Sequence, residues 1–374
     1  MATKSHSPDT LGLELETLIR TRAEISKIIK GILPDGTIKQ VTKDASVESP
    51  IAYLASDVTL FLGNDLSKRL AKPYLCDTAG YELVTVPLTF PEMCKVVKIL
   101  CAYQVKTGEI FSNRTSFHVH TGYPSGAVFV RTALALGLKI EPLFYKIAGM
   151  GNVFRGLTNN AAYCRALASP PAVVLHDTGR MAILDPLGAI DADSAASMWG
   201  HLGRLDNDTE RYSPLRYFGI NVYSIPLRGT LEFRHFNYCN LSRHMEAAIS
   251  LCQMTADVMQ RIPISVATGL KQVSIFEPND NGTYNSILDD LLSIADYYHS
   301  EYMMKRRHIE TIRELIEITP QPVFSREIVA SHIKTPRIGV GDANRFDLKL
   351  VGSAQEPGIV DIHVFNNSER HLVE

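Results

Sequence analysis

The stretch RGTLEFRHFN, residues 228–237, predicts a buried β-strand that carries charge on one face. Successive side chains of a strand point to opposite faces, so residues at positions i and i+2 share a face. One face is expected to hold Thr230, Glu232, Arg234 and Phe236, and the other face Leu231, Phe233 and His235. Glu232 and Arg234 are therefore expected side by side. Taken alone, this pattern is better explained by an exposed edge strand with an ion pair of little energetic value.

Composition narrows the class of protein. The chain has 374 residues and 45% hydrophobic content, which suffices for one large domain or two ordinary ones. The formal net charge of -2 provides no global basic field, so we expect neither a nucleic acid nor a membrane as partner. The six cysteines show no C-x-x-C spacing and are expected to be buried free thiols. Residues 1–10 lack the apolar segment of a secretory signal, so we expect a cytoplasmic protein.

Three further segments alternate with period two and carry ionisable groups on a single face. They are TLGLELETLI (10–19) with Glu14 and Glu16, GYELVTVPLTF (80–90) with Glu82, and RTSFHVHTGY (114–123) with His118 and His120. Each has a bland explanation: the glutamates could mark a solvated strand face, and the histidines a chance pairing. Together, four such strands favour a built site. Clustered carboxylates repel one another and are costly to bury unless a cation compensates them.

The residue types indicate which ligands such a site would take. Carboxylate oxygens with an occasional imidazole suit Mg²⁺ or Mn²⁺. An arginine among acids indicates an anionic partner beside the metal, and a nucleotide phosphate meets that need because a guanidinium binds phosphate in a planar, bidentate way.

Other segments predict the elements around these strands. A turn at Asp35–Gly36 predicts a hairpin over 33–48, and residues 217–226 and 229–237 predict two strands linked by a turn at 226–229. Residues 176–214 are expected to be irregular, and two short strand-like runs lie at 345–352 and 358–365. Helices are predicted over 91–108, 125–148, 152–167 and 240–262, the last with Asn240 as N-cap, and one long helix or two over 286–319.

The order of these motifs resembles the amidoligase family of the carboxylate–amine ligase superfamily, which includes glutamine synthetase and glutamate–cysteine ligase. The resemblance covers roughly residues 10–262, although an insertion separates Asp44 from Gly80 and the spacer 176–210 does not align with the family; the final hundred residues have no counterpart. The motifs are GLELE (12–16), KDAS (43–46) with GYELVTVPL (80–88), SFHVHTG (116–122), FRGLTNNAAYC (154–164), RYFGIN (216–221) and GTLEFRHF (229–236).

The resemblance implies an α+β fold, in which a curved antiparallel sheet forms a half barrel like that of glutamine synthetase and helices pack on its convex face. It implies a catalytic domain over residues 1–262, and residues 263–374 are left as a C-terminal extension, helical and then irregular. The concave face is expected to bind ATP and Mg²⁺ or Mn²⁺.

The resemblance also implies residue roles. Glu14, Glu16, Glu82 and Glu232 match metal ligands, with one of His118 and His120, of which His118 is preferred. Arg234 matches the phosphate-binding arginine and, with Glu232, is a catalytic candidate. Arg216 and Asn221 are expected near the nucleotide, and Arg155 near the substrate carboxylate.

The implied function is an ATP-dependent ligase that joins a carboxylate to an amine, each a small molecule or a peptide, through an acyl phosphate. Because some relatives assemble into rings, the resemblance leaves open whether this protein forms a homo-oligomer. Two alternatives stay open beside it. A divalent-metal-dependent hydrolase would need no ATP and would leave Arg234 without a clear task. A non-catalytic scaffold on a ligase-like fold would show no metal-dependent nucleotide affinity.

Overall fold

The computed structural model describes residues 9–19, 33–43, 79–107, 115–148, 164, 166–168, 172–175, 181–184, 218–237, 241–275, 279–322, 346–351 and 361–366. The predicted helix over 152–167 lies almost wholly outside these ranges. Among the helices described there, none combines the length and the hydropathy needed to cross a membrane.

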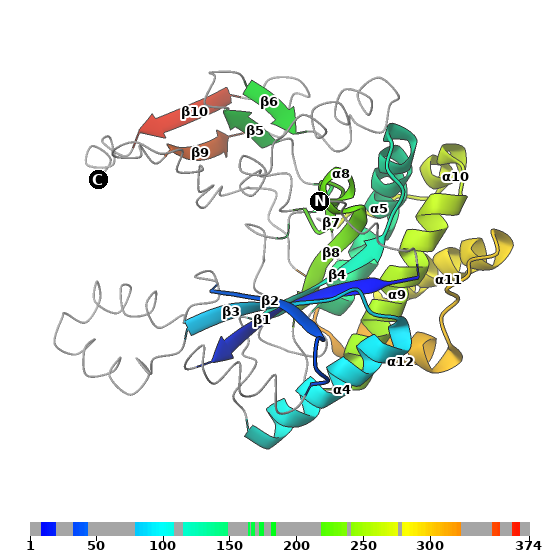
Figure 1. Ribbon diagram of the computed structural model, residues 1–374. Helices are drawn as coiled ribbons and strands as arrows, with labels where there is room; N and C mark the ends of the chain where they lie inside the picture. Colours follow the sequence, from blue (N-terminus) through cyan, green and yellow to red (C-terminus); the bar gives the residue numbers. More distant parts are fainter. Residues whose placement is uncertain are drawn as a thin grey trace.

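A six-stranded antiparallel sheet with the order β2-β3-β1-β4-β8-β7 carries the candidate site (Figure 1). Leucines at alternate positions of β1 are fully buried, which explains why this segment forms a central strand. The strands are β1 Leu11–Ile19, β2 Ile38–Lys43, β3 Ala79–Thr85, β4 Ser116–Gly122, β7 Ile220–Asn221 and β8 Thr230–Asn237.

The strand register aligns the polar side chains into a row across the sheet. Glu16 of β1 lies opposite Glu82 of β3, and Glu14 lies opposite His118 of β4. His120 of β4 in turn lies opposite Glu232 of β8. Groups far apart in the sequence therefore meet on one face, because alternation puts each of them on the same side of its own strand.

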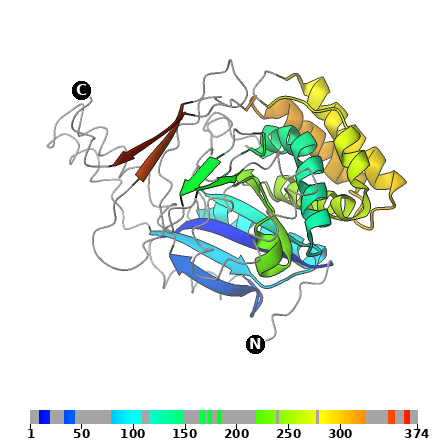
Figure 2. The ribbon, with the colours of Figure 1, turned by 90° about the horizontal axis from the view of Figure 1, so that it is seen from above.

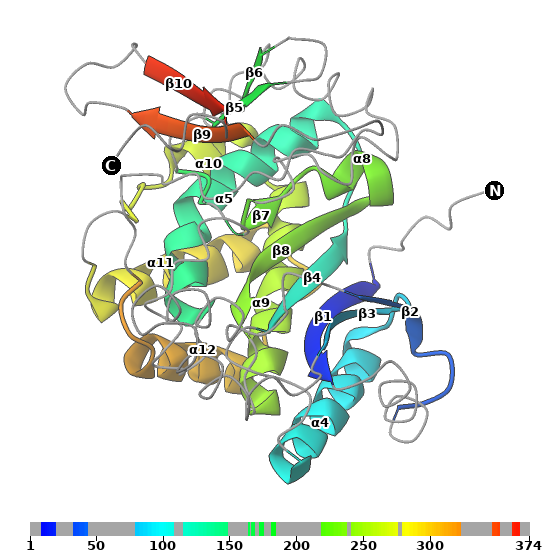
Figure 3. The same ribbon diagram turned by 90° about the vertical axis from the view of Figure 1, so that its left-hand side faces the viewer.

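Helices gather on one side of the sheet, as Figure 2 shows from above. The helices α5 Ala127–Ala148 and α9 Ser242–Arg261 pack on strands β4 and β8, and α4 Phe90–Thr107 packs on α9 (Figure 3). Behind them, α10 Ile264–Gly269, α11 Asn281–Tyr297 and α12 Arg306–Ile318 pack on α5 or α9. The remaining elements are α8 Ser224–Arg228 and the hairpins of β5 Ala172–Leu175 with β6 Met181–Leu184 and β9 Phe346–Val351 with β10 Asp361–Asn366.

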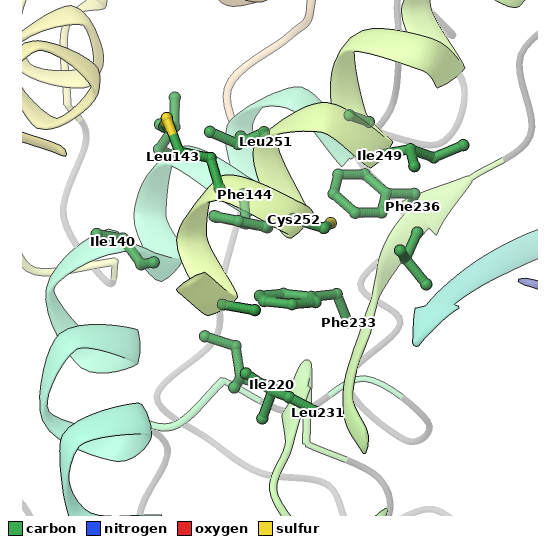
Figure 4. Close-up of a cluster of buried hydrophobic side chains, with 14 of the residues drawn as sticks. Ile140, Leu143, Phe144, Ile220, Leu231, Phe233, Phe236, Ile249, Leu251 and Cys252 are labelled. Carbon is green, nitrogen blue, oxygen red and sulfur yellow. The ribbon is translucent and has the colours of Figure 1, made fainter. Parts of the chain in front are cut away.

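One hydrophobic core joins the sheet to both helix layers. Phe144 of α5 stacks on Phe233 of β8 at a centroid distance of 5.4 Å, and Figure 4 shows this contact beside Leu251 and Cys252 of α9. The buried Lys146 donates from Nζ to the Thr319 carbonyl oxygen at 2.5 Å, which ties α5 to the end of α12. Helices beyond the boundary predicted at residue 262 thus share the core, and the boundary itself stays a prediction.

A β-bulge in β8 corrects the predicted placement of Phe236. The register between β4 and β8 shifts between the pairs Phe117–Phe236 and Val119–Phe233, so β8 holds one extra residue there. Phe236 consequently shares the core face with Phe233 and stacks on Phe117 at 5.3 Å instead of lining the polar face with Arg234.

Other local predictions also change. A short helix, α8, replaces the turn predicted at 226–229, and the left-handed Gly229, with φ of 66°, ends it. The N-cap of α9 is Leu241 and not the predicted Asn240, because the first helical residue is Ser242. Strand β6 lies inside the segment predicted to be irregular, where pairing with β5 supplies hydrogen bonds that composition does not reveal.

The strand predicted over 217–226 is much shorter, because β7 covers only Ile220–Asn221 and the helical turn of α8 begins at Ser224. Several other predictions hold. The helices over 91–108, 125–148 and 240–262 are confirmed within two residues at each end, and the segment 286–319 forms two helices. The turn at Asp35–Gly36 is present, but among the described residues it does not join two paired strands, because the strand after it pairs with β3. The α+β class is confirmed, while the half barrel stays a prediction.

Candidate metal centre

Three ionisable side chains from neighbouring strands converge on the polar face of the sheet. Glu14 of β1, His120 of β4 and Glu232 of β8 each offer one ligand atom, and these atoms all lie within 4.8 Å of one another. All three side chains are buried. Two carboxylates and an imidazole in this arrangement can enclose a divalent cation.

His120 is oriented as a metal ligand would be. Its Nδ1 lies 3.1 Å from the Thr230 hydroxyl, which holds the ring from behind. Its Nε2 lies 3.2 Å from Glu14 Oε1 and 3.9 Å from Glu232 Oε1, yet this buried nitrogen makes no hydrogen bond. A buried polar atom of this kind is costly unless something else satisfies it.

His118, the histidine preferred from the sequence, has a different environment. Its Nδ1 lies 3.3 Å from Glu14 Oε2 and 3.5 Å from Glu232 Oε1, so the ring lies beside both carboxylates. Its Nε2 lies 3.4 Å from the Ser116 hydroxyl. The group with metal-ligand spacing therefore contains His120, and His118 lies next to it.

Glu16 and Glu82 lie farther along the same row of the sheet. The Glu16 carboxylate accepts hydrogen bonds from the Ser116 amide at 2.9 Å and from the Ser116 hydroxyl at 2.5 Å. Glu82 lies directly opposite Glu16 in the pairing of β1 with β3 and is partly exposed. Neither joins the group of three, although both keep the predicted face.

Arg234 and Asn221 hold the Glu232 carboxylate from two sides. Arg234 donates from a guanidinium NH₂ group to Glu232 Oε1 at 2.5 Å, and Asn221 donates from Nδ2 to Glu232 Oε2 at 2.6 Å. The Asn221 side-chain oxygen accepts from the Tyr223 amide at 2.9 Å. Both ends of the Asn221 amide therefore contact the chain, so Asn221 orients Glu232 directly.

A second arginine, which sequence reasoning missed, contacts the other carboxylate. Arg228 at the end of α8 donates to Glu14 Oε1 at 2.5 Å, while 53% of its side chain remains exposed. The sequence does contain a signal for Arg228, because this residue opens the stretch 228–237 and directly precedes Gly229, at which the chain turns into β8. The predicted residues Arg155 and Arg216 lie outside the described part of the chain.

The surrounding charges keep both carboxylates ionised. Burial alone would raise the pKa of Glu14, but His120, His118 and Arg228 together hold it well below its usual value. Burial likewise opposes ionisation of Glu232, while Arg234 and His120 lower its pKa to about 2. The pKa of Arg234 is raised by Glu232 and Glu14 against the opposing effect of burial. The Glu14 and Glu232 carboxylates are thus both ionised and lie beside the imidazole of His120.

This geometry defines a class of protein: an α+β protein whose sheet presents acidic and imidazole ligands for a cation beside arginines suited to an anion. The family model described as "Putative amidoligase enzyme" matches residues 7–256, which is more than half of the chain, and the chain belongs to this family. Membership makes it an enzyme of the ligase type. No curated protein matches the chain.

Proposed function

We propose that this protein is an ATP-dependent ligase that forms an amide bond between a carboxylate and an amine through an acyl phosphate. The observation that carries the proposal is the cluster of Glu14, His120 and Glu232 in a chain of the amidoligase family. The hydrogen-bond-free Nε2 of His120, aimed at two ionised carboxylates, supports a cation at this point.

In the proposed reaction, an oxygen of the substrate carboxylate attacks the γ-phosphorus of ATP. The bond between that phosphorus and the bridging oxygen breaks, and ADP leaves. The amine nitrogen then attacks the acyl carbon, the carbon–oxygen bond to phosphate breaks, and phosphate and a proton are released. Such transfers depend mainly on positioning and on neutralising charge.

The donor set fits a hard cation. Glu14, His120 and Glu232 would hold Mg²⁺ or Mn²⁺, with Glu16, Glu82 and His118 as further candidate ligands along the row. When bound, the cation would neutralise charge on the phosphate oxygens.

The chain's own residues would then have distinct tasks. Arg234 would stabilise negative charge on the phosphoryl group, for which its ion pair with Glu232 keeps it in place. Asn221 would fix the direction of the Glu232 carboxylate, in addition to its predicted place near the nucleotide. Arg216 and Arg155 remain proposed as nucleotide and substrate contacts.

Two measurements test the proposal. Calorimetry with Mg²⁺-ATP and with ATP plus chelator should show metal-dependent binding, and equal affinity in both would refute the metal site. A screen of amino acids and polyamines should then find phosphate release that needs a carboxylate and an amine together. Hydrolysis of a substrate without ATP would instead favour the metal-dependent hydrolase.

A further inference from the structure

Two arginines neutralise the two carboxylates of the candidate metal centre, and they differ in burial. Arg234 lies within β8 with 8% of its side chain exposed and pairs with Glu232. Arg228 reaches Glu14 from the end of α8, outside the sheet, and keeps 53% of its side chain exposed. Arg228 can therefore leave its carboxylate by rotating its own side chain toward solvent, whereas Arg234 has no comparable exposure.

Arg228 contacts the same Glu14 oxygen that a bound cation would need. Arg228 contacts Glu14 Oε1, and the same oxygen lies 3.2 Å from His120 Nε2, the nitrogen without a hydrogen bond. A divalent ion bound by His120 and Glu14 through these atoms would be close to the guanidinium. Two cations that share one oxygen at short range repel each other strongly in a buried site.

We propose that Arg228 is a competing internal cation that satisfies Glu14 in the metal-free protein and is displaced from it when a divalent cation binds. The inference rests on the metal site proposed above. Arg228 would then be a positioning residue, which compensates the buried Glu14 carboxylate together with His118 and His120 and sets the affinity for the metal. Its half-exposed side chain and its place at the end of α8, before Gly229, would allow the side chain to move without disturbing β8.

Competition with the metal and orientation of Glu14 predict opposite changes in Mn²⁺ affinity when Arg228 is replaced. If Arg228 competes with the metal, Arg228→Gln should bind Mn²⁺ about tenfold more tightly than wild type, since a charge-assisted contact no longer has to be broken. If Arg228 instead only orients Glu14 for the metal, the same variant should bind Mn²⁺ more weakly. Arg228→Lys keeps the positive charge and should remain close to wild type.

The matched control is Arg306→Gln. Arg306 is an exposed arginine of α12 paired with Glu310 at 2.8 Å, so this variant removes the same charge from a helix that packs on α5 and α9. Its Mn²⁺ affinity should equal that of wild type. Calorimetry with Mn²⁺ alone, without nucleotide, measures all four proteins, and thermal melting with chelator confirms that each is folded.

A second readout follows the guanidinium itself. Phenylglyoxal labelling of Arg228, quantified by mass spectrometry, should rise severalfold when wild type is saturated with Mn²⁺, while labelling of Arg306 stays constant. In Glu14→Gln, labelling of Arg228 should already be high and insensitive to Mn²⁺. Equal or weaker Mn²⁺ binding by Arg228→Gln, or constant labelling in metal-loaded wild type, would overturn the inference while leaving the metal site intact. Absence of Mn²⁺ binding in wild type and in Arg228→Gln would overturn both.

Discussion

Replacing Arg234 by methionine should destabilise the protein in a pH-dependent way. The substitution keeps an unbranched side chain but removes the cation that lies 2.5 Å from Glu232 Oε1. Both side chains are less than 10% exposed, so solvent cannot take over the role of the arginine. Breaking a buried pair by removing one partner costs about 3–5 kcal/mol, because the other charge stays buried without compensation. Because the entropy of unfolding grows with chain length, this is a loss of roughly 4–6 °C in Tm for a chain of 374 residues.

The pH dependence follows from the pKa of Glu232. In wild type this pKa is lowered from 4.5 to about 2, so the carboxylate stabilises the fold above about pH 4.5 and loses this contribution as the pH falls through 2. In Arg234→Met the lowering by the arginine is gone, while burial, which raises the pKa, remains. Protonation of Glu232 then relieves the buried charge at a higher pH. The Tm deficit of the variant should therefore shrink as the pH is lowered from about 7 to about 4.5.

Thermal melting with chelator at several pH values measures this effect. The double variant Glu232→Gln/Arg234→Met removes both charges and keeps a side-chain oxygen for Asn221, so it should recover most of the lost Tm. A loss below about 1 kcal/mol at neutral pH, as for an exposed ion pair, would refute the placement of Arg234 in a buried pair. A deficit that stays constant with pH would refute the role assigned to Glu232.

Three further outcomes test the fold. Phe236→Ala should cost about 3–5 kcal/mol and leave Mn²⁺ affinity unchanged, because the bulge turns this ring into the core; altered metal affinity with unchanged melting would place it on the polar face instead. Gly219→Ala should lower stability by about 1–3 kcal/mol, since its new methyl group would lie 2.3 Å from His235 Nε2, and an unchanged denaturant midpoint would contradict this packing. Truncation after Ile262 should give insoluble protein, because α10–α12 cover α5 and α9 in the shared core; a soluble fragment with cooperative unfolding would show that the extension is separable.

The sequence alone determines the direction of most side chains within each strand. Leu13 and Leu15 alternate with Glu14, and both leucines are buried in the core while Glu14 lies on the site face. This works because alternation is a property of a single strand and needs no knowledge of its neighbours. The same local signals predict helices α4, α5 and α9, and the order of short motifs indicates the family.

Only the tertiary structure decided how these strands meet. The bulge that moves Phe236 into the core arises from the pairing of β4 with β8, and no alternation within β8 reveals it. The group of Glu14, His120 and Glu232 depends on register across three strands, which also brings His118 beside the two carboxylates. Arg228 and Glu14 are 214 positions apart, and their contact exists because α8 ends where β8 begins. Register and long-range contacts are collective properties of the packed chain, so a pattern confined to one segment does not contain them.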